Sequence, residues 1–80
     1  MQYYINTIEQ TKDSEGKLAE YGKSEKVSDY NTALSKFYTK LSNVSADIGK
    51  NHTYMHISIV NSQGFENKSD TVGTYEETKE

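Results

Sequence analysis

A stripe of apolar residues with helical spacing marks the middle of the chain. Apolar side chains recur there at steps of three and four residues, which places them on one face of an α-helix. Ser28 or Asp29 can cap the amino end, and Gly49 can adopt the left-handed conformation that ends many helices. The pattern therefore predicts an amphipathic helix over residues 29–48. Its apolar stripe consists of Tyr30, Ala33, Leu34, Phe37, Tyr38, Leu41, Val44 and Ile48.

A period of two replaces the helical period directly after this segment. Residues 53–60 are rich in β-branched and aromatic side chains, and their alternation is typical of a half-buried strand. We expect one set to face the core and the other to face away from it. The first set is Met55, Ile57 and Ile59, and the second is Tyr54, His56 and Ser58. Residues 61–64 predict a turn, and a connection longer than a tight hairpin should lead to a last strand over 70–75.

The first third of the chain has the composition of a hairpin. Residues 3–8 predict a strand, residues 12–16 a turn with Gly16 at its end, and residues 17–27 a weak return strand. Gly22 and several charged residues inside that return strand favour an edge position. The whole order predicts an α+β fold, an antiparallel sheet of about four strands (ββαββ order) with the helix packed on one face. We expect a single domain over residues 1–75 and a frayed acidic tail over 76–80.

The predicted core joins the helix stripe to the inward-facing strand positions. It contains Ile5 or Ile8, Leu18, Leu34, Phe37, Leu41, Val44, Ile48, Met55, Ile57, Ile59 and Val72.

Composition narrows the class of protein. The chain has 80 residues and a formal net charge of −3, and it contains seven Tyr but no Cys. Its nine basic residues are all Lys, so the planar Arg group that commonly grips phosphate and guanine is missing, which disfavours nucleic acid as a partner. Without Cys, disulfides and thiolate metal sites are excluded. No apolar run spans a bilayer and no signal peptide is visible, so we expect a cytoplasmic protein without a membrane partner.

Lack of Arg and Pro is typical of an AT-rich genome. In size and composition the chain resembles the accessory proteins of phages and mobile elements in low-GC bacteria. That resemblance rests on no motif.

Residues with catalytic potential are few. His52 and His56 should lie about 13 Å apart on one strand, too far to share a metal ion. We expect both on the exposed face. The paired carboxylates fall in a turn or in the tail, where a carboxyl group is hard to desolvate. No nucleotide-binding, nucleophile or calcium motif is present. The sequence therefore predicts no enzyme, no cofactor, no metal site and no small-molecule substrate.

Tyrosine is the one excess that suggests a function. If the helix covers one sheet face, then Tyr54, His56, Tyr75 and Tyr21 are candidates for a binding surface on the other, since Tyr is enriched at interface hot spots. The same side chains could simply stiffen an open sheet. We expect a small non-catalytic protein-interaction module that binds a protein partner or itself.

The alternative function is a single-strand nucleic-acid binder that stacks bases on sheet tyrosines. It needs a basic groove. Lys17, Lys23 and Lys26 could form one only if Glu20 and Glu25 point away.

Overall fold

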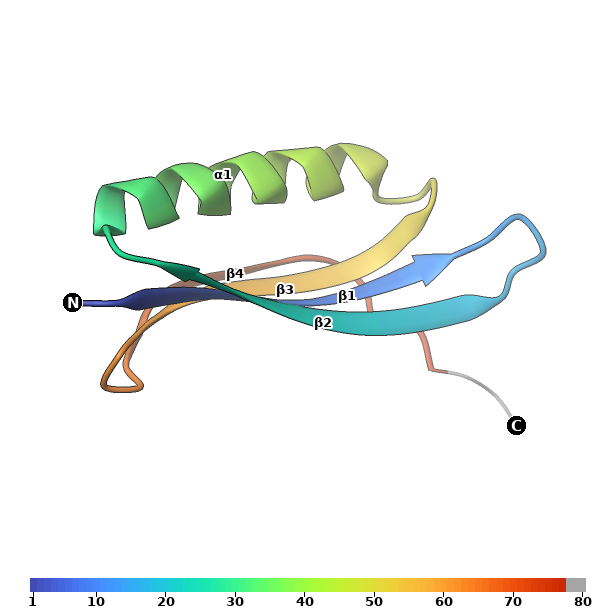
Figure 1. Ribbon diagram of the computed structural model, residues 1–80. Helices are drawn as coiled ribbons and strands as arrows, with labels where there is room; N and C mark the ends of the chain where they lie inside the picture. The colour runs from blue at the N-terminus through green and yellow to red at the C-terminus, as the bar shows by residue number, and fades with distance from the viewer. Residues whose placement is uncertain (78–80) are drawn as a thin grey trace.

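One sheet and one helix make up the part of the chain that the structure describes, residues 1–77 of a computed structural model. The order is β1 (Tyr3–Lys12), β2 (Leu18–Val27), α1 (Tyr30–Asp47), β3 (His52–Asn61) and β4 (Glu66–Gly73). The four strands form an antiparallel sheet in the order β2-β1-β3-β4, and α1 lies along one face (Figure 1). This confirms the predicted α+β fold and places β2 at an edge. No helix within these residues is long and apolar enough to cross a bilayer.

The helix forms where its stripe and caps predict it. The Asp29 carboxylate accepts a hydrogen bond from the Thr32 backbone N–H at 2.8 Å, and Gly49 adopts a φ of 86° just beyond the helix. Because β2 and β3 are each antiparallel to β1, which lies between them, α1 must cross over β1 to connect them. The helix therefore presses its stripe onto the two central strands. The buried core consists of Ile5, Val27, Ala33, Phe37, Val44, Met55, Ile57 and Ile59.

Two of the predicted core positions differ in the structure. Of the two isoleucines in β1, Ile5 is buried, whereas Ile8 lies on the opposite face and is 54% exposed. Leu18 is half-buried at the start of β2 and lies outside the core cluster, while Val27 at the other end of that strand joins it. Four other residues that were predicted as core are only partly buried and pack against the buried cluster: Leu34, Leu41, Ile48 and Val72.

The last hairpin is tighter than the sequence suggests. The predicted last strand is present as β4, but it spans Glu66–Gly73 rather than residues 70–75, so the predicted bounds and the long connection before the strand are wrong. The Asn61 carboxamide oxygen accepts hydrogen bonds from the backbone N–H groups of Gln63 and Phe65 at 2.9 and 3.1 Å. Gly64 supplies the positive φ of 89° that closes the turn.

A β-bulge changes the face on which the first residues of β3 lie. Gln10 pairs with Tyr54 but Thr11 pairs with His52, so Thr53 is an extra residue in β3. His52 therefore lies on the helix side of the sheet, although it is two residues from Tyr54 on the other side. The expectation that both histidines occupy the exposed face is wrong for His52 and correct for His56.

Candidate functional site

Among residues 1–77, no helix covers the sheet face turned away from α1, which we call the open face (Figure 1). The strand registers place on it Tyr4, Asn6 and Ile8 of β1, Tyr54, His56 and Ser58 of β3, Ser69 and Thr71 of β4, and Glu20, Ser24 and Lys26 of β2. This surface therefore mixes aromatic, aliphatic and small polar groups, with one charge of each sign on β2.

Ile8 is the exposed apolar residue near the centre of the open face. Its neighbours across the two strand pairs are Gly22 on β2 and His56 on β3. Because Gly22 has no side chain to cover one flank of Ile8, that isoleucine remains 54% exposed. The glycine in β2 thus leaves an apolar side chain uncovered beside His56 and Tyr54 of β3.

The residues after β4 cross one end of the open face, and we call Thr74–Glu77 the C-terminal strap. The Tyr75 ring stands edge-on against Tyr54, with centroids 5.6 Å apart, and its hydroxyl donates to Glu20 Oε1 at 2.7 Å. That carboxylate raises the pKa of the Tyr75 hydroxyl. Tyr54, expected to be exposed, is therefore half-buried by a neighbouring part of the same chain.

A buried glutamine fixes the strap to the central strand. The Gln10 side chain is 1% exposed; its amide donates to the Glu76 carbonyl at 2.6 Å and accepts from the Glu76 N–H at 2.9 Å. Lys12 adds an ion pair to the Glu76 carboxylate at 3.1 Å. Glu76 begins the predicted frayed tail, and the last three residues of that tail, 78–80, lie outside the described residues.

Three of the four predicted binding residues meet on the open face. Tyr54 and Tyr75 are in contact, and His56 lies two residues along β3 with its Nδ1 atom 2.8 Å from Thr71 Oγ1. Tyr21 does not join them. It pairs with Glu9 across β1 and β2, on the helix side of the sheet, because it shares the alternation of the buried positions.

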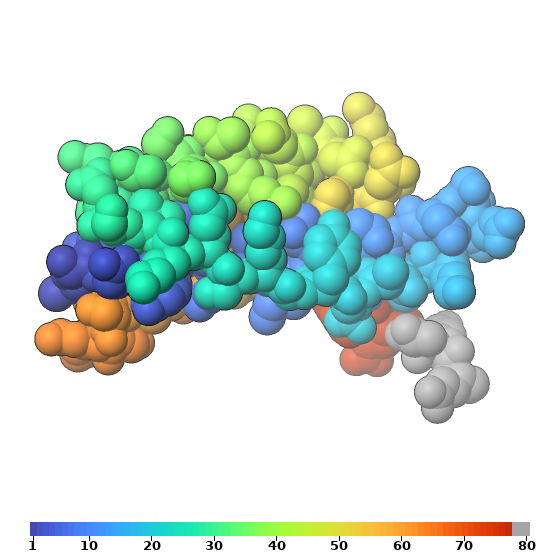
Figure 2. Space-filling model, in the orientation of Figure 1, coloured from blue at the N-terminus to red at the C-terminus, as the bar shows by residue number. Residues whose placement is uncertain are grey.

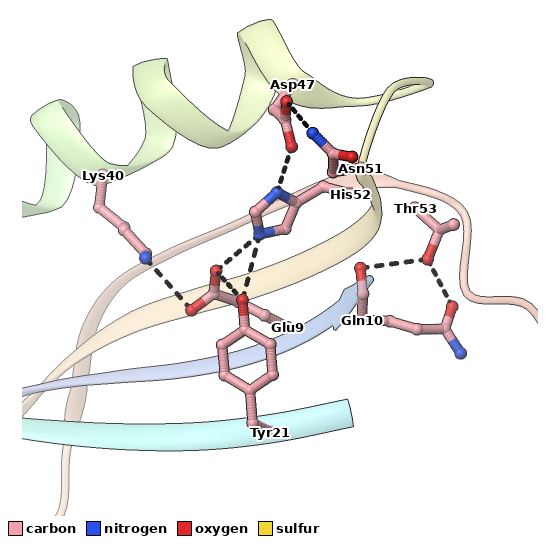
Figure 3. Close-up of polar contacts among 8 residues, drawn as sticks. All are labelled: Glu9, Gln10, Tyr21, Lys40, Asp47, Asn51, His52 and Thr53. Atoms are coloured by element: carbon pink, nitrogen blue, oxygen red, sulfur yellow. Dashed lines mark hydrogen bonds and ion pairs between the residues drawn. The ribbon is translucent and has the colours of Figure 1, made fainter. Parts of the chain in front are cut away.

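A polar cluster around the buried Glu9 carboxylate lies on the helix side and was not predicted (Figure 3). We call Glu9, Tyr21, Lys40, Asp47 and His52 the Glu9 cluster. The Glu9 side chain is 2% exposed, and its carboxylate contacts Lys40 Nζ at 3.2 Å, His52 Nε2 at 2.9 Å and the Tyr21 hydroxyl at 3.4 Å. His52 Nδ1 lies 2.7 Å from Asp47 Oδ2 at the end of α1. The cluster thus joins α1 to three strands.

The geometry of this cluster favours a structural role over acid–base chemistry. Both ring nitrogens of His52 face a carboxylate oxygen, so neither is left to take a proton from a substrate. The hydrogen bond from His52 holds the pKa of Asp47 below its ordinary value. Partial burial, and then the Glu9 carboxylate, raise the pKa of the Tyr21 hydroxyl. The Asp47 shift thus reflects a bond inside the cluster, whereas the Tyr21 shift reflects burial first and the Glu9 carboxylate second.

The sequence carried a signal for this cluster in the alternation of β1. Ile5, Thr7 and Glu9 share one face of that strand, so burial of Ile5 places Glu9 on the helix side as well. A carboxylate at such a position needs partners.

Within residues 1–77, no group of three or more His, Asp or Glu side chains is arranged to hold a metal ion. Comparison with protein families, curated proteins and solved structures gives no match to this chain.

Proposed function

We propose that this chain is a small non-catalytic protein-interaction module that binds through the open face. The observation that carries the proposal is Ile8, an isoleucine 54% exposed beside the half-buried Tyr54 and His56 on a sheet face without a covering helix. A cluster of aromatic and aliphatic groups ringed by small polar residues is the usual composition of an interface centre. The partner is a second copy of the chain or another protein, and the lack of Cys is compatible with work in the reducing cytoplasm.

Charge and placement support this function over nucleic-acid binding. Lys23 pairs with Thr7 on the helix side, whereas Lys26 pairs with Tyr4 on the open face, so these lysines do not line one groove. Glu20 shares the open face with Lys26 and accepts the hydrogen bond of Tyr75. A strand of nucleic acid stacked on the tyrosines would therefore meet a carboxylate where it needs a cation.

The test compares the wild-type chain with Ile8→Thr, which keeps a β-branched side chain but removes apolar surface. Size-exclusion chromatography with light scattering, over a range of concentrations, reports self-association. Immobilised wild-type and variant chains, exposed to the same bacterial lysate, report binding to other proteins. Thr39→Ala, on the exposed side of α1, is the matched control.

We expect association or capture that Ile8→Thr weakens and Thr39→Ala preserves. A wild-type chain that stays monomeric and captures nothing more than Ile8→Thr does would overturn the proposal. Titration with a single-stranded oligonucleotide at low salt tests the alternative. Affinity that falls steeply with added salt would favour that alternative function.

A further inference from the structure

The outer edge of β2 is the longer of the two sheet edges. β2 has ten residues and lies at one end of the strand order, so within residues 1–77 only β1 pairs with it. Its register with β1 has no bulge, whereas β4, at the other edge, has eight residues and a register shift. Figure 2 shows β2 (teal) along the front of the molecule with no other described segment over it. An unprotected edge of this kind is a template for pairing with a further strand.

Alternate backbone groups of β2 point away from β1. The Asp13 N–H donates to the Lys17 carbonyl at 3.0 Å, and this pair continues the register of the two strands toward their turn. Because bonded pairs alternate with non-bonded pairs in an antiparallel ladder, the odd-numbered residues of β2 are the ones bonded to β1. The even-numbered residues therefore direct their N–H and C=O groups outward. They are Leu18, Glu20, Gly22, Ser24 and Lys26.

Gly22, in the middle of this edge, is not required to be glycine by the fold. Each of the other four glycines has a positive φ, but Gly22 does not. A Cβ atom at position 22 would meet only the Thr7 carbonyl oxygen, at an ordinary contact distance of 3.5 Å. Glycine inside a strand lowers stability, and it often marks a place where another chain approaches closely. The reason for this glycine therefore lies outside the single chain.

The charged residues of β2 include cations without a partner. Lys23 and Lys26 lie on opposite faces of the sheet, and neither forms an ion pair among the described residues. The Glu25 side chain is 41% exposed although it pairs with Lys36 at 2.7 Å, so its carboxylate is accessible to a second cation. The edge thus carries both a free ammonium group and an accessible carboxylate on its helix side.

We propose that β2 pairs antiparallel with β2 of a second copy, around a two-fold axis at Ser24, and joins the two sheets into one. This register places outward-directed residues opposite each other, because Ser24 meets Ser24 and Gly22 meets Lys26 of the second copy. It also places Lys23 opposite Glu25 of the second copy, twice by symmetry, and opposes no like charges. Opposite charges directly across two strands stabilise their pairing. An axis one residue earlier would instead oppose the two Lys23 side chains.

The same register gives a reason for glycine at position 22. Lys26 of the second copy lies across from Gly22 on the open face, and Ile8 is the neighbour of Gly22 on β1. The aliphatic stem of that lysine can then lie over the bare backbone of Gly22 and cover the exposed flank of Ile8 while its ammonium group stays in water. The axis is perpendicular to the sheet, so both open faces lie on one side of the dimer. Binding through the open face does not depend on this edge contact, which goes beyond the proposed function.

Two complementary charge reversals test the pairing in the full chain. Lys23→Glu alone and Glu25→Lys alone each oppose like charges at both symmetric pairs, whereas a mixed dimer of the two variants opposes unlike charges at both. Sedimentation velocity over a range of concentrations measures the dissociation constant of each dimer. We expect it to rise by about tenfold for either variant alone and to return to about the wild-type value in the equimolar mixture. Lys26→Glu mixed with Glu25→Lys is the matched control and should not restore the dimer, since position 26 faces Gly22.

Hydrogen exchange of the wild-type chain tests the register without any variant. In the dimer the N–H groups of Gly22, Ser24 and Lys26 are hydrogen-bonded, so their exchange should slow as the protein concentration rises. The N–H groups of Tyr21 and Lys23 already bond to β1 in the single chain and should change less.

A wild-type chain that stays monomeric up to about 1 mM would overturn the proposal. A mixture of the two reversals that associates no better than either variant alone, or no better than the control mixture, would overturn it as well. A dimer that Ile8→Thr abolishes and that both reversals leave intact would place the contact on the open face. That result would support the proposed function and refute the pairing of β2.

Discussion

Replacing His52 with glutamine should remove the side chain that connects the end of α1 to the buried carboxylate of Glu9. His52 Nε2 lies 2.9 Å from Glu9 Oε1, and Nδ1 lies 2.7 Å from Asp47 Oδ2. Glutamine at position 52 is not a ring with nitrogens on opposite sides, so it cannot bridge the two carboxylates in the same way. We expect the free energy of unfolding to fall.

The size of the loss follows from what Glu9 keeps. Its side chain is 2% exposed, and without His52 it retains Lys40 at 3.2 Å and a long contact to the Tyr21 hydroxyl at 3.4 Å. A hydrogen bond to a charged group contributes about 1.5–3 kcal/mol, and water cannot easily replace it at a buried carboxylate. We therefore expect a loss of about 2–3 kcal/mol, which lowers the unfolding midpoint of a domain this small by about 10–20 °C.

His56→Gln is the matched control for this prediction. It makes the same substitution on the same strand, but His56 lies on the open face and has one hydrogen bond, to the exposed Thr71. We expect a loss below about 1 kcal/mol for it. Urea denaturation followed by circular dichroism at neutral pH measures both variants, with equal m values as the condition for comparing them. Similar losses for His52→Gln and His56→Gln would refute the argument that the bulge carries His52 into a buried cluster.

The remaining predictions concern the helix, a glycine and the loss of folding stability at acidic pH. Phe37 is 0% exposed, so Phe37→Ala should cost about 3–5 kcal/mol in urea denaturation, and a loss under about 1 kcal/mol would show that the ring is not core. Gly73 has a φ of 74°, and a Cβ atom there would lie 2.1 Å from a backbone oxygen, whereas Gly64, at a φ of 89°, has nothing within 4 Å. Gly73→Ala should therefore lower the unfolding midpoint well below that of Gly64→Ala, and equal midpoints would contradict the close approach. His52 holds the pKa of Asp47 below its ordinary value, so the stability from Asp47 is present above about pH 4 and is lost as the pH falls through the lowered pKa. Asp47→Asn should then lose less stability than the wild type between about pH 4 and pH 2, and parallel curves would exclude this role.

Local patterns predicted the elements that depend on local physics. The helix needed only its stripe and its Asp29 cap, and both lie within a few residues of each other along the chain. The faces of β3 followed from strict alternation around Met55, Ile57 and Ile59, which the structure buries completely. In each case the signal and the structure it specifies occupy the same segment.

The missed features depend on contacts between distant segments. Placement of His52 on the helix side requires the register shift opposite Gln10 and Thr11, some 40 residues earlier in the chain. The sequence around His52 contains no pattern that predicts an extra residue in β3. Tyr21 was grouped with Tyr54 and Tyr75 because all are tyrosines, yet its face depends on the pairing with Glu9. The C-terminal strap likewise depends on the buried Gln10 side chain, 66 residues away from Glu76. Composition alone cannot supply such pairings.

A mismatch between the width of the helix and that of the sheet explains the polar residues on the helix side of β2. A helix about 10 Å wide cannot cover four strands spaced about 4.8 Å apart, and α1 contacts β3, β1 and β4 more than β2. The edge strand β2 therefore has polar residues, Tyr21, Lys23 and Glu25, at its helix-facing positions. Tyr21 reaches toward the helix side through the Glu9 cluster, and Glu25 does so through its ion pair with Lys36.

The same shortage of covering elements acts on the other side of the sheet. There the C-terminal strap is the segment that covers the strands, and it reaches one end, at Gln10, Glu20 and Tyr54. Ile8 lies beyond it and has Gly22 as its neighbour on β2. The single helix within residues 1–77 cannot cover both faces of a four-stranded sheet. The proposed function requires a second chain to cover Ile8, which is why Ile8→Thr is the substitution that tests that function most directly.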